Sequence, residues 1–484
     1  MGKERRDGER RRLPPRPSAC GLALLALAAG VPAADAAEAP WRLQEAVGAP
    51  AWLELGGTFR LRSEGLSSHL RPGVEGSDRI LVGRLLLDAR VGDERLFARI
   101  ELEDARAFLD DEDTPLGTDD VDAAEVLQAH VGARLPDVLR EGDRVDLQAG
   151  RMTLDLGSRR LVARNRFRNT INGFTGVHGA WRAPAPGSAA DGAPQSEGRA
   201  LQAFFLLPVE RRPTERRRLD DNEAELDRES FEVRLWGLHL ADPRLAADLR
   251  GEAYVLGLTE EDRPGAPTRN RRLVTAGGRI LRPPARARWD FEVEAALQRG
   301  ETRRSTSAAD DTDLDQRAWF AHAEVGRTFD RWATPRLVLL LDYASGDEDP
   351  DDRRDERFDT LFGARRFEFG PTGIFGILAR SNLRAPGVRL ELTPGSGRSL
   401  MAAWRPVWLA SRRDVLTTNG VGDPQGEEGF VGHLIELRYR TTPLPGSLGL
   451  ELGAAHLVAG ELLGAPPASL DDSTYGYLQT TFTF

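Results

Sequence analysis

Residues 474–484, TYGYLQTTFTF, form the stretch that decides the fold we predict for this chain. Successive side chains of an extended strand point to opposite faces, so one face of this stretch is apolar and the other polar. The chain stops on an aromatic residue in mid-strand, which leaves an adhesive edge unless the first strand of the same sheet pairs with it. The stretch therefore indicates either the closing strand of a barrel or the edge strand of a soluble sandwich.

The same alternation recurs from Trp52 to the end of the chain. Charged residues such as Glu54 and Arg60 fall on one face only, which is the outside of a soluble sandwich or the lumen of a membrane barrel. An even strand number would make the first and last strands antiparallel neighbours. We predict an all-β fold, a transmembrane antiparallel up-and-down β-barrel of about 18 strands, near 53–61, 81–91, 96–102, 124–135, 143–152, 173–183, 199–209, 230–241, 246–258, 271–282, 287–299, 316–328, 335–345, 386–393, 398–410, 429–441, 446–458 and 474–484.

The connections between these segments alternate in length. Short turns lie at 91–94, 241–244 and 443–446. This asymmetry is typical of barrels with short periplasmic turns and long extracellular loops. We expect the long loops at 104–122, 184–198, 210–229, 259–270, 300–315, 346–385 and 411–428.

The N-terminus predicts export. Seven basic residues precede an apolar run at 21–31, and the small-x-small pattern at 34–36 suits cleavage. The run is too short to span a bilayer as a helix, and the alternative is a buried N-terminal helix. We expect 1–36 to be a signal peptide, 37–50 a short periplasmic segment and 51–484 the outer-membrane barrel.

Composition limits the function. The only cysteine, Cys20, lies in the leader, so we expect a mature chain without disulfides. Removing the leader, with its seven basic and four acidic residues, lowers the formal charge from -10 to -13, which argues against nucleic acid as a partner. Mean hydropathy is -0.42. That average does not exclude a membrane barrel, because the apolar outer face and the polar inner face of such a barrel offset each other in the mean hydropathy.

Residues 150–177, GRMTLDLGSRRLVARNRFRNTINGFTGV, carry six arginines and no acid after Asp155. Guanidinium groups suit carboxylate recognition, and a row of them in a lumen would favour a polyanion. A solvated basic loop, or arginines paired with acids elsewhere, explains the pattern equally well.

Two motifs resemble those of the alginate export family, large bacterial outer-membrane barrels. The first comprises Gly150-Arg151, Leu154, Gly157, Arg160-Leu161-Val162, Asn169 and Phe174-Thr175-Gly176-Val177. The more distinctive second is 358–363, FDTLFG, continuing through Arg366-Phe367, Phe369-Gly370, Phe375 and Ser381-Asn382-Leu383. The terminal Phe likewise resembles the C-terminal signature of outer-membrane barrels.

The resemblance implies an 18-stranded barrel with an arginine-rich constriction that conducts a uronate polymer outward. Carried onto this chain, the pore-lining candidates are Arg151, Arg160, Arg164, Arg166, Arg365 and Arg366. Strand parity separately places on the lumen face Arg60, Arg84, Arg99 and Arg405. Acids such as Glu101 and Glu292 share that face, so we expect a lumen of mixed charge.

Catalysis and metal binding find little support in the sequence. The seven histidines are scattered, without HExxH or GxSxG, and the nearest hydrolase-like group is Thr153, Ser158 and His178. The acidic runs 110–113 and 347–352 have ligands for Ca²⁺ but no EF-hand spacing, and we interpret them as solvated loops. We expect no enzyme activity, catalytic residue, cofactor or metal ligand.

Two functional hypotheses follow. The first is a passive outer-membrane pore that conducts an anionic, alginate-like exopolysaccharide outward. The second is a diffusion or uptake porin for small anions or oligosaccharides on the same scaffold. The expected partners are outer-membrane lipid and lipopolysaccharide, the anionic polysaccharide and periplasmic export machinery.

Overall fold

The last strand of the chain pairs with the first. In the computed structural model, β19 (Ser473–Thr483) lies antiparallel to β1 (Leu53–Leu66), in register from Thr58↔Thr483 to Leu66↔Tyr475. The backbone N–H of Phe484 donates to the Gly57 carbonyl over 3.0 Å, and the Gly57 N–H donates to the Phe484 carbonyl over 2.8 Å. A Cβ on Gly57 would lie 2.5 Å from the Leu86 carbonyl oxygen, so this approach requires glycine. The closed barrel is confirmed, and the sandwich alternative is wrong.

The structure describes residues 40–484 except 75, 112, 185–197, 264 and 308. The predicted signal peptide and Cys20 lie outside the described residues. The described strands between β1 and β19 are β2 (Asp78–Gly92), β3 (Leu96–Phe108), β4 (Asp122–Pro136), β5 (Arg144–Met152), β6 (Phe174–Arg182), β7 (Ala200–Pro208), β8 (Val233–Ala246), β9 (Leu249–Glu260), β10 (Arg272–Arg282), β11 (Trp289–Arg303), β12 (Asp313–Thr328), β13 (Arg336–Ala344), β14 (Arg354–Asp355), β15 (Leu383–Gly395), β16 (Arg398–Trp408), β17 (Phe430–Leu444) and β18 (Leu448–Ala459).

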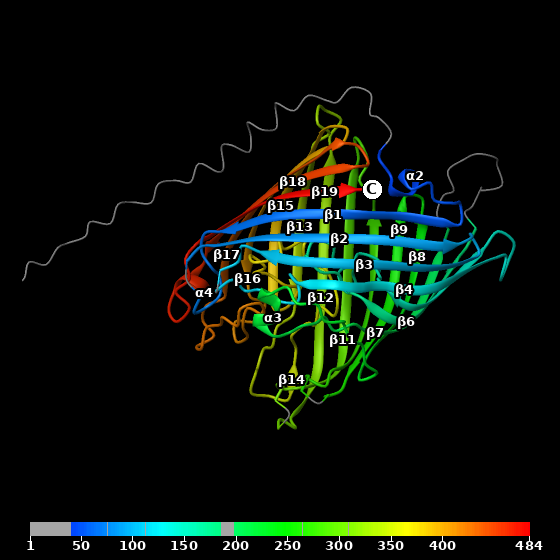
Figure 1. The fold of residues 1–484 in the computed structure, drawn as a ribbon. Coiled ribbons are helices and arrows are strands. Elements are labelled where there is room, and N and C mark those ends of the chain that lie inside the picture. The colour runs from blue at the N-terminus through cyan, green and yellow to red at the C-terminus, as the bar shows by residue number, and fades with distance from the viewer. Residues whose placement is uncertain (1–39, 75, 112, 185–197, 264, 308) are drawn as a thin grey trace, which may run out of the picture. The chain divides into compact units, whose positions relative to one another are not determined.

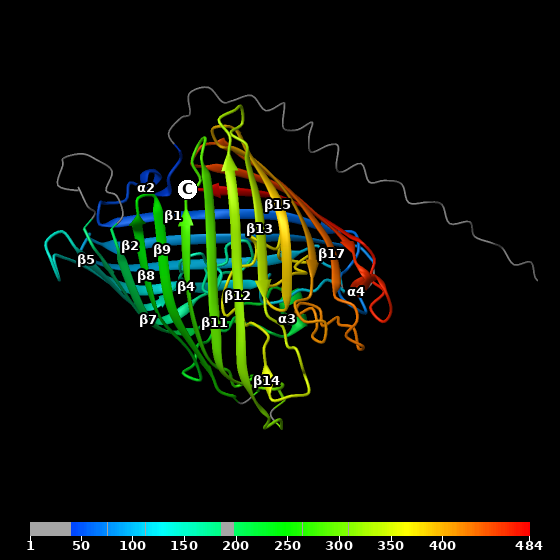
Figure 2. The same cartoon turned by 180° about the vertical axis from the view of Figure 1, so that it is seen from behind.

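Eighteen of the nineteen described strands build the wall. Each pairs antiparallel with its chain neighbours, and β13 pairs directly with β15. β14 is a two-residue parallel pairing with β12 and lies outside this order. The wall containing β1–β4 and the wall containing β11–β13 face each other, as the front and back views show (Figures 1 and 2). The predicted strand number is confirmed; β1, β3 and β11 extend several residues further than we expected.

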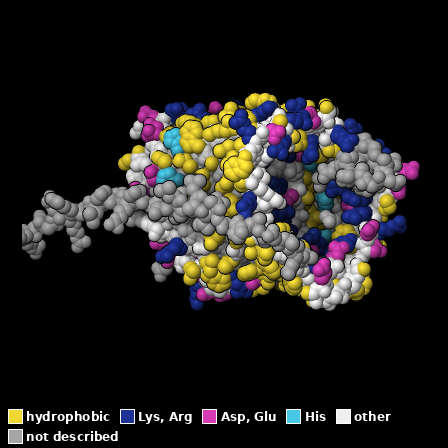
Figure 3. Space-filling view, turned by 90° about the horizontal axis from the view of Figure 1, so that it is seen from above, with side chains coloured by type: hydrophobic (Ala, Val, Ile, Leu, Met, Phe, Trp, Pro, Cys, Tyr) yellow, Lys and Arg dark blue, Asp and Glu magenta, His cyan; other side chains and the backbone are white. Residues whose placement is uncertain are grey.

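The alternation of side chains separates a lipid face from a lumen face. On β1, Phe59 and Leu61 are 46% and 37% exposed, whereas Arg60, Arg62 and Glu64 between and beyond them are at most 3% exposed. Viewed from above, hydrophobic side chains cover much of the outer surface, while charged groups gather around a hollow (Figure 3). Apolar residues outside and charged residues inside are the arrangement of a barrel that crosses a membrane.

The connections confirm the predicted asymmetry with one correction. Short turns at 93–95, 247–248, 396–397 and 445–447 lie at one end of the barrel, and long loops such as 209–232 and 409–429 lie at the other. We grouped 184–198 with the long loops, but β6 and β7 are joined at the end of the short turns. The reason is strand parity, since each strand reverses the chain direction. Residues 185–197 of that connection lie outside the described residues.

Three short helices, α2 (Leu43–Ala46), α3 (Arg216–Asp220) and α4 (Glu461–Gly464), complete the described elements. Within residues 40–484 as described, no helix has the length and apolar character needed to span a bilayer. The segment before β1 packs on the seam, where the Trp41 ring stacks on Phe482 with centroids 6.2 Å apart.

Substitutions on the two faces of β19 test the assignment of lipid and lumen. Leu478 is 48% exposed on the outer face, and Thr481 lines an inner cavity. Leu478→Arg should lower the free energy of unfolding in a lipid bilayer by about 2–4 kcal/mol, the cost of a guanidinium at mid-membrane. Thr481→Arg should change it by less than about 1 kcal/mol. Equal effects in urea titrations of the folded barrel would contradict the assignment.

Candidate functional site

Two long loops enter the lumen instead of covering its mouth. The first, 153–173, joins β5 to β6 and carries most of the arginine-rich motif. The second, 345–382, joins β13 to β15 and carries the FDTLFG motif. Many residues of this second loop are buried, so it lies inside the barrel as a plug and does not cover the mouth as a lid.

Buried arginines of the wall hold the first loop by its backbone. The Arg60 guanidinium donates to the carbonyl oxygens of Arg166 and Arg168, each over 2.7 Å. Arg84 donates to the carbonyls of Arg168 and Asn169 over 3.1 and 3.2 Å. Carbonyls carry no net charge, so these contacts fix the loop without cancelling the charge of Arg60 and Arg84.

Asn169 reinforces the same attachment from the loop side. It is fully buried, and its side-chain amide donates to the Asp120 carbonyl over 2.7 Å and to the Gly83 carbonyl over 3.1 Å. The Asn of the first motif is therefore a structural anchor, because it provides hydrogen bonds for backbone groups that lie away from water.

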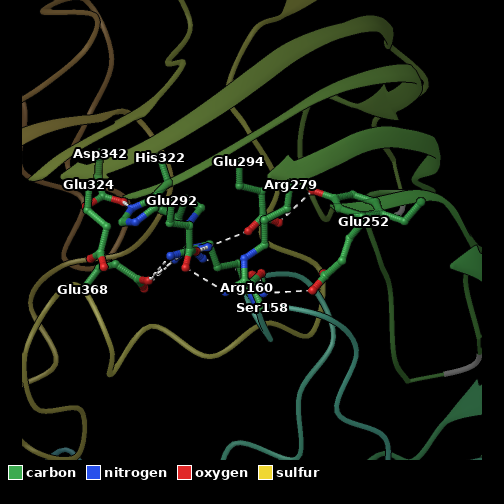
Figure 4. A network of polar contacts seen from close by, with 12 residues as sticks. Ser158, Arg160, Glu252, Arg279, Glu292, Glu294, His322, Glu324, Asp342 and Glu368 are labelled. Carbon is green, nitrogen blue, oxygen red and sulfur yellow. Dashed lines mark hydrogen bonds and ion pairs between the residues drawn. The ribbon is translucent and has the colours of Figure 1, made fainter. Parts of the chain in front are cut away.

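Arg160 binds the tip of the loop to the opposite wall. Its guanidinium lies 2.5 Å from Glu292 and 2.5 Å from Glu294, both on β11, and 2.9 Å from Glu368 of the second loop (Figure 4). The Arg160 side chain is 6% exposed. Three carboxylates around one buried cation form a structural cluster that leaves no guanidinium edge free for a passing anion.

The second loop pairs with the first along its backbone. Val162 and Phe362 form a parallel bridge, and the Ala364 N–H donates to the Arg159 carbonyl over 2.9 Å. A Cβ on Gly363 would lie 1.8 Å from the Arg160 carbonyl oxygen, which explains the glycine of the FDTLFG motif. Both family-like motifs therefore build one unit inside the barrel.

Ion pairs neutralise most of the predicted pore arginines. Arg366 lies 2.6 Å from Glu436 and donates to the Tyr477 hydroxyl over 3.0 Å. The remaining pairs are Arg151 with Glu125 and Glu229, Arg164 with Glu101, Arg99 with Asp88, and Arg405 with Asp342. The expectation of a lumen with mixed charge fits this geometry better than a row of free arginines.

Arg166 and Arg365 differ from that group. The Arg166 side chain is 62% exposed although it lies 2.8 Å from Asp155, and pairs this exposed are weak. Burial and the neighbouring Arg168 lower the pKa of Arg365 to about 10, still well above neutral pH. The Arg365 side chain is therefore positively charged at neutral pH.

Two cavities meet at Arg166. A vestibule of about 720 Å³ opens beside the seam, and a chamber of about 190 Å³ lies next to it; Asp155 and Arg166 line both. The chamber is lined by five arginines and two acids, together with Asn165, Phe167, Phe367 and Gln479; the charged residues are Arg60, Arg159, Arg166, Arg366, Arg440, Asp155 and Glu451. We call these spaces the vestibule and the chamber.

Sequence reasoning missed part of this lining. Arg440 shares the inward face of β17 with Glu436, and parity was a sufficient signal for it. Arg159 lies in the arginine-rich stretch, but its approach to the chamber depends on loop geometry that no periodic pattern encodes. The positive φ of 68° at Arg159 is one such local feature.

The hydrolase-like group does not assemble into a catalytic unit. Thr153 Oγ1 accepts from Arg164 over 2.8 Å, and Ser158 Oγ accepts from the Arg160 N–H over 3.3 Å. His178 Nε2 instead contacts the Gln202 side chain on the neighbouring strand, over 3.1 Å. The three side chains thus have separate structural partners.

Comparisons with solved structures agree with this architecture. The chain is similar to three Pseudomonas aeruginosa proteins. OccK8 (OprE) is 11% identical, with a TM-score of 0.53 and coverage of 89% of this chain and 98% of that one. OccK7 (OpdD) is 13% identical, with a TM-score of 0.52 and coverage of 90% and 99%, and OccK11 (OpdR) is 14% identical, with a TM-score of 0.50 and coverage of 89% and 96%. At such identities the likeness concerns the fold alone. By sequence, the chain matches none of the curated proteins.

The family comparison is more specific. The model of the alginate export family matches residues 51–475, from the residue before Trp52 to the first residues of β19. This span contains both motifs, both inward loops and the whole chamber apart from Gln479. The chain belongs to the alginate export family and has the barrel of an outer-membrane pore.

Proposed function

We propose that this pore conducts an anionic, alginate-like uronate polysaccharide outward through the chamber. The observation that supports this proposal most strongly is the positive charge of Arg60 and Arg84, which donate to carbonyls of the first loop. The exposed Arg166 belongs to the same loop. Guanidinium groups held in a narrow, partly dehydrated passage attract carboxylates more strongly than the same groups in bulk water.

The type of cation supports a carboxylate cargo. Lys3 is the only lysine in the sequence, so every basic side chain of the barrel is an arginine or a histidine. A guanidinium forms paired hydrogen bonds with a carboxylate and stays charged throughout the physiological range. Uronates carry one carboxylate per sugar, which suits a passage with several arginines at intervals.

A second candidate is diffusion of small anions or acidic oligosaccharides. The observation that favours it is the narrow chamber between the two inward loops, whose volume of about 190 Å³ is small for the passage of a polymer. Passage of a polymer would require the unit formed by 153–173 and 345–382 to shift. The two candidates therefore differ in whether these loops move.

Reversal of the Arg166 charge tests the anion pathway. Arg166→Glu should lower the anion-to-cation permeability ratio in planar bilayers several-fold, because it changes the field where vestibule and chamber meet. Arg217→Glu is the matched control, since the Arg217 side chain is 93% exposed on a loop. The ratio of the control should stay close to that of the unmodified pore. An unchanged ratio in Arg166→Glu would contradict a path through the chamber.

Removal of the Arg160 charge tests loop movement. Arg160→Gln leaves Glu292, Glu294 and Glu368 without their shared cation, a loss of about 3–5 kcal/mol for a broken buried pair. We expect the strands to persist while the inward loops loosen, with larger single-channel conductance and faster proteolysis within 345–382. Oligouronates would then block the current for longer than in the unmodified pore. Unchanged conductance and proteolysis would show that Arg160 does not hold the loops.

A further inference from the structure

Three acidic side chains from two segments meet inside the barrel, near the end of the long loops, and a fourth lies on the neighbouring strand. Asp122 begins β4, Glu125 follows on the same strand, and Asp227 belongs to the loop 209–232. Carboxylate oxygens of these three lie within 4.8 Å of one another, and all three residues are buried. Glu103 of β3 is the cross-strand partner of Glu125 in the sheet register, so it faces the same side of the wall.

Neighbouring donors satisfy only part of this cluster. Glu125 receives the Arg151 guanidinium over 2.5 Å and the Asp227 N–H over 2.8 Å. Asp227 in turn accepts from the Arg212 N–H over 2.7 Å. These contacts position the carboxylates. Arg151 is hydrogen-bonded to the Glu125 carboxylate, and the charge of Arg211 acts on Asp122 and Asp227 without a hydrogen bond to either carboxylate.

Two oxygens in the cluster lack any partner among the described residues. They are Asp122 Oδ1 and Glu103 Oε1, on side chains that are each 1% exposed. A buried carboxylate oxygen without a donor is costly, because it has lost its water and gained nothing in exchange. Glu103 is not one of the three converging acids, so its unpaired oxygen is an observation independent of theirs.

We propose that Asp122, Glu125 and Asp227, with Glu103, bind a Ca²⁺ ion. Ca²⁺ takes six to eight oxygen ligands in flexible geometry, and carboxylates are its usual protein ligands. Side chains from β3, β4 and the loop 209–232 would then share one cation. The sequence shows acidic runs only at 110–113 and 347–352, which we interpret as solvated loops. It gives no sign of this site, because the site assembles only when distant segments fold together.

The position of the site gives the cation a structural role in the pore. Glu103 Oε2 accepts the Ile171 N–H over 3.4 Å, which connects the cluster to the first inward loop. A bound Ca²⁺ would attach the loop 209–232 to the wall, because Asp227 belongs to that loop while Asp122 and Glu125 belong to β4.

Calorimetric titration of the refolded barrel with CaCl₂ in detergent tests the proposal. Detergent excludes lipopolysaccharide, which binds divalent cations itself. We expect one saturable site with a dissociation constant of about 0.1–1 mM, the range of extracellular calcium modules. Asp122→Asn should weaken it at least about tenfold, whereas Asp351→Asn, in an exposed acidic run, should leave it unchanged.

Thermal unfolding separates loss of the ion from loss of the fold. Asp122→Asn removes a buried charge, so in EDTA the variant should unfold at a temperature equal to or above that of the unmodified chain. In 5 mM CaCl₂ the order should reverse, because only the unmodified chain gains from binding. Glu103→Gln gives the same test should Asp122→Asn not refold. Absence of saturable binding in the unmodified barrel, or equal binding in the variants, would overturn the proposal.

Discussion

Burial of charge inside a closed wall is the constraint on which the structure depends. A barrel in a membrane must present apolar side chains outward, so its charged residues are forced inward, away from bulk water. There they need partners, and this chain supplies them from two loops that fold into the lumen. Arg160, with three carboxylates from the wall and the second loop, is the clearest case. The ion pairs that stabilise the interior also narrow the pore.

This arrangement separates structural arginines from those available to a solute. Arg151, Arg164 and Arg405 are committed to acids of neighbouring strands or loops. Arg60 and Arg84 are equally committed, but to carbonyls, which carry no net charge that could cancel theirs. A buried guanidinium bound to backbone therefore anchors a loop and also makes the electrostatic potential in the chamber more positive. Selectivity of the pore then depends on a few groups and not on the number of arginines.

Periodicity was sufficient to predict the wall. The alternation in 474–484 and 53–61 predicts that these two strands form the seam. The same alternation along the whole chain predicts the strand number and the lumen face, because each follows from the two-residue repeat of a strand. It failed for the connection 184–198, which is long and polar and which we therefore expected at the extracellular end. Strand parity places it at the other end.

The site was harder to predict because loops carry it. Sequence likeness identified the two motifs, yet their residues prove to be anchors such as Asn169 and Gly363 rather than contacts for a solute. Which arginine meets which acid depends on the path of 153–173 across the lumen, and no local pattern encodes that path. The same holds for the acids around Asp122, which come from three segments.

Charge-dependent thiol modification in the chamber tests the account most directly. The described chain has no cysteine, so Gln479→Cys introduces a single reactive group into the chamber lining. Its rates with an anionic and a cationic methanethiosulfonate reagent, each divided by the rate for a free thiol in solution, report the local potential. The account predicts a clear preference for the anionic reagent that is lost in the Arg166→Glu background. Equal normalised rates, or a preference for the cationic reagent, would contradict an anion-selective passage through this chamber.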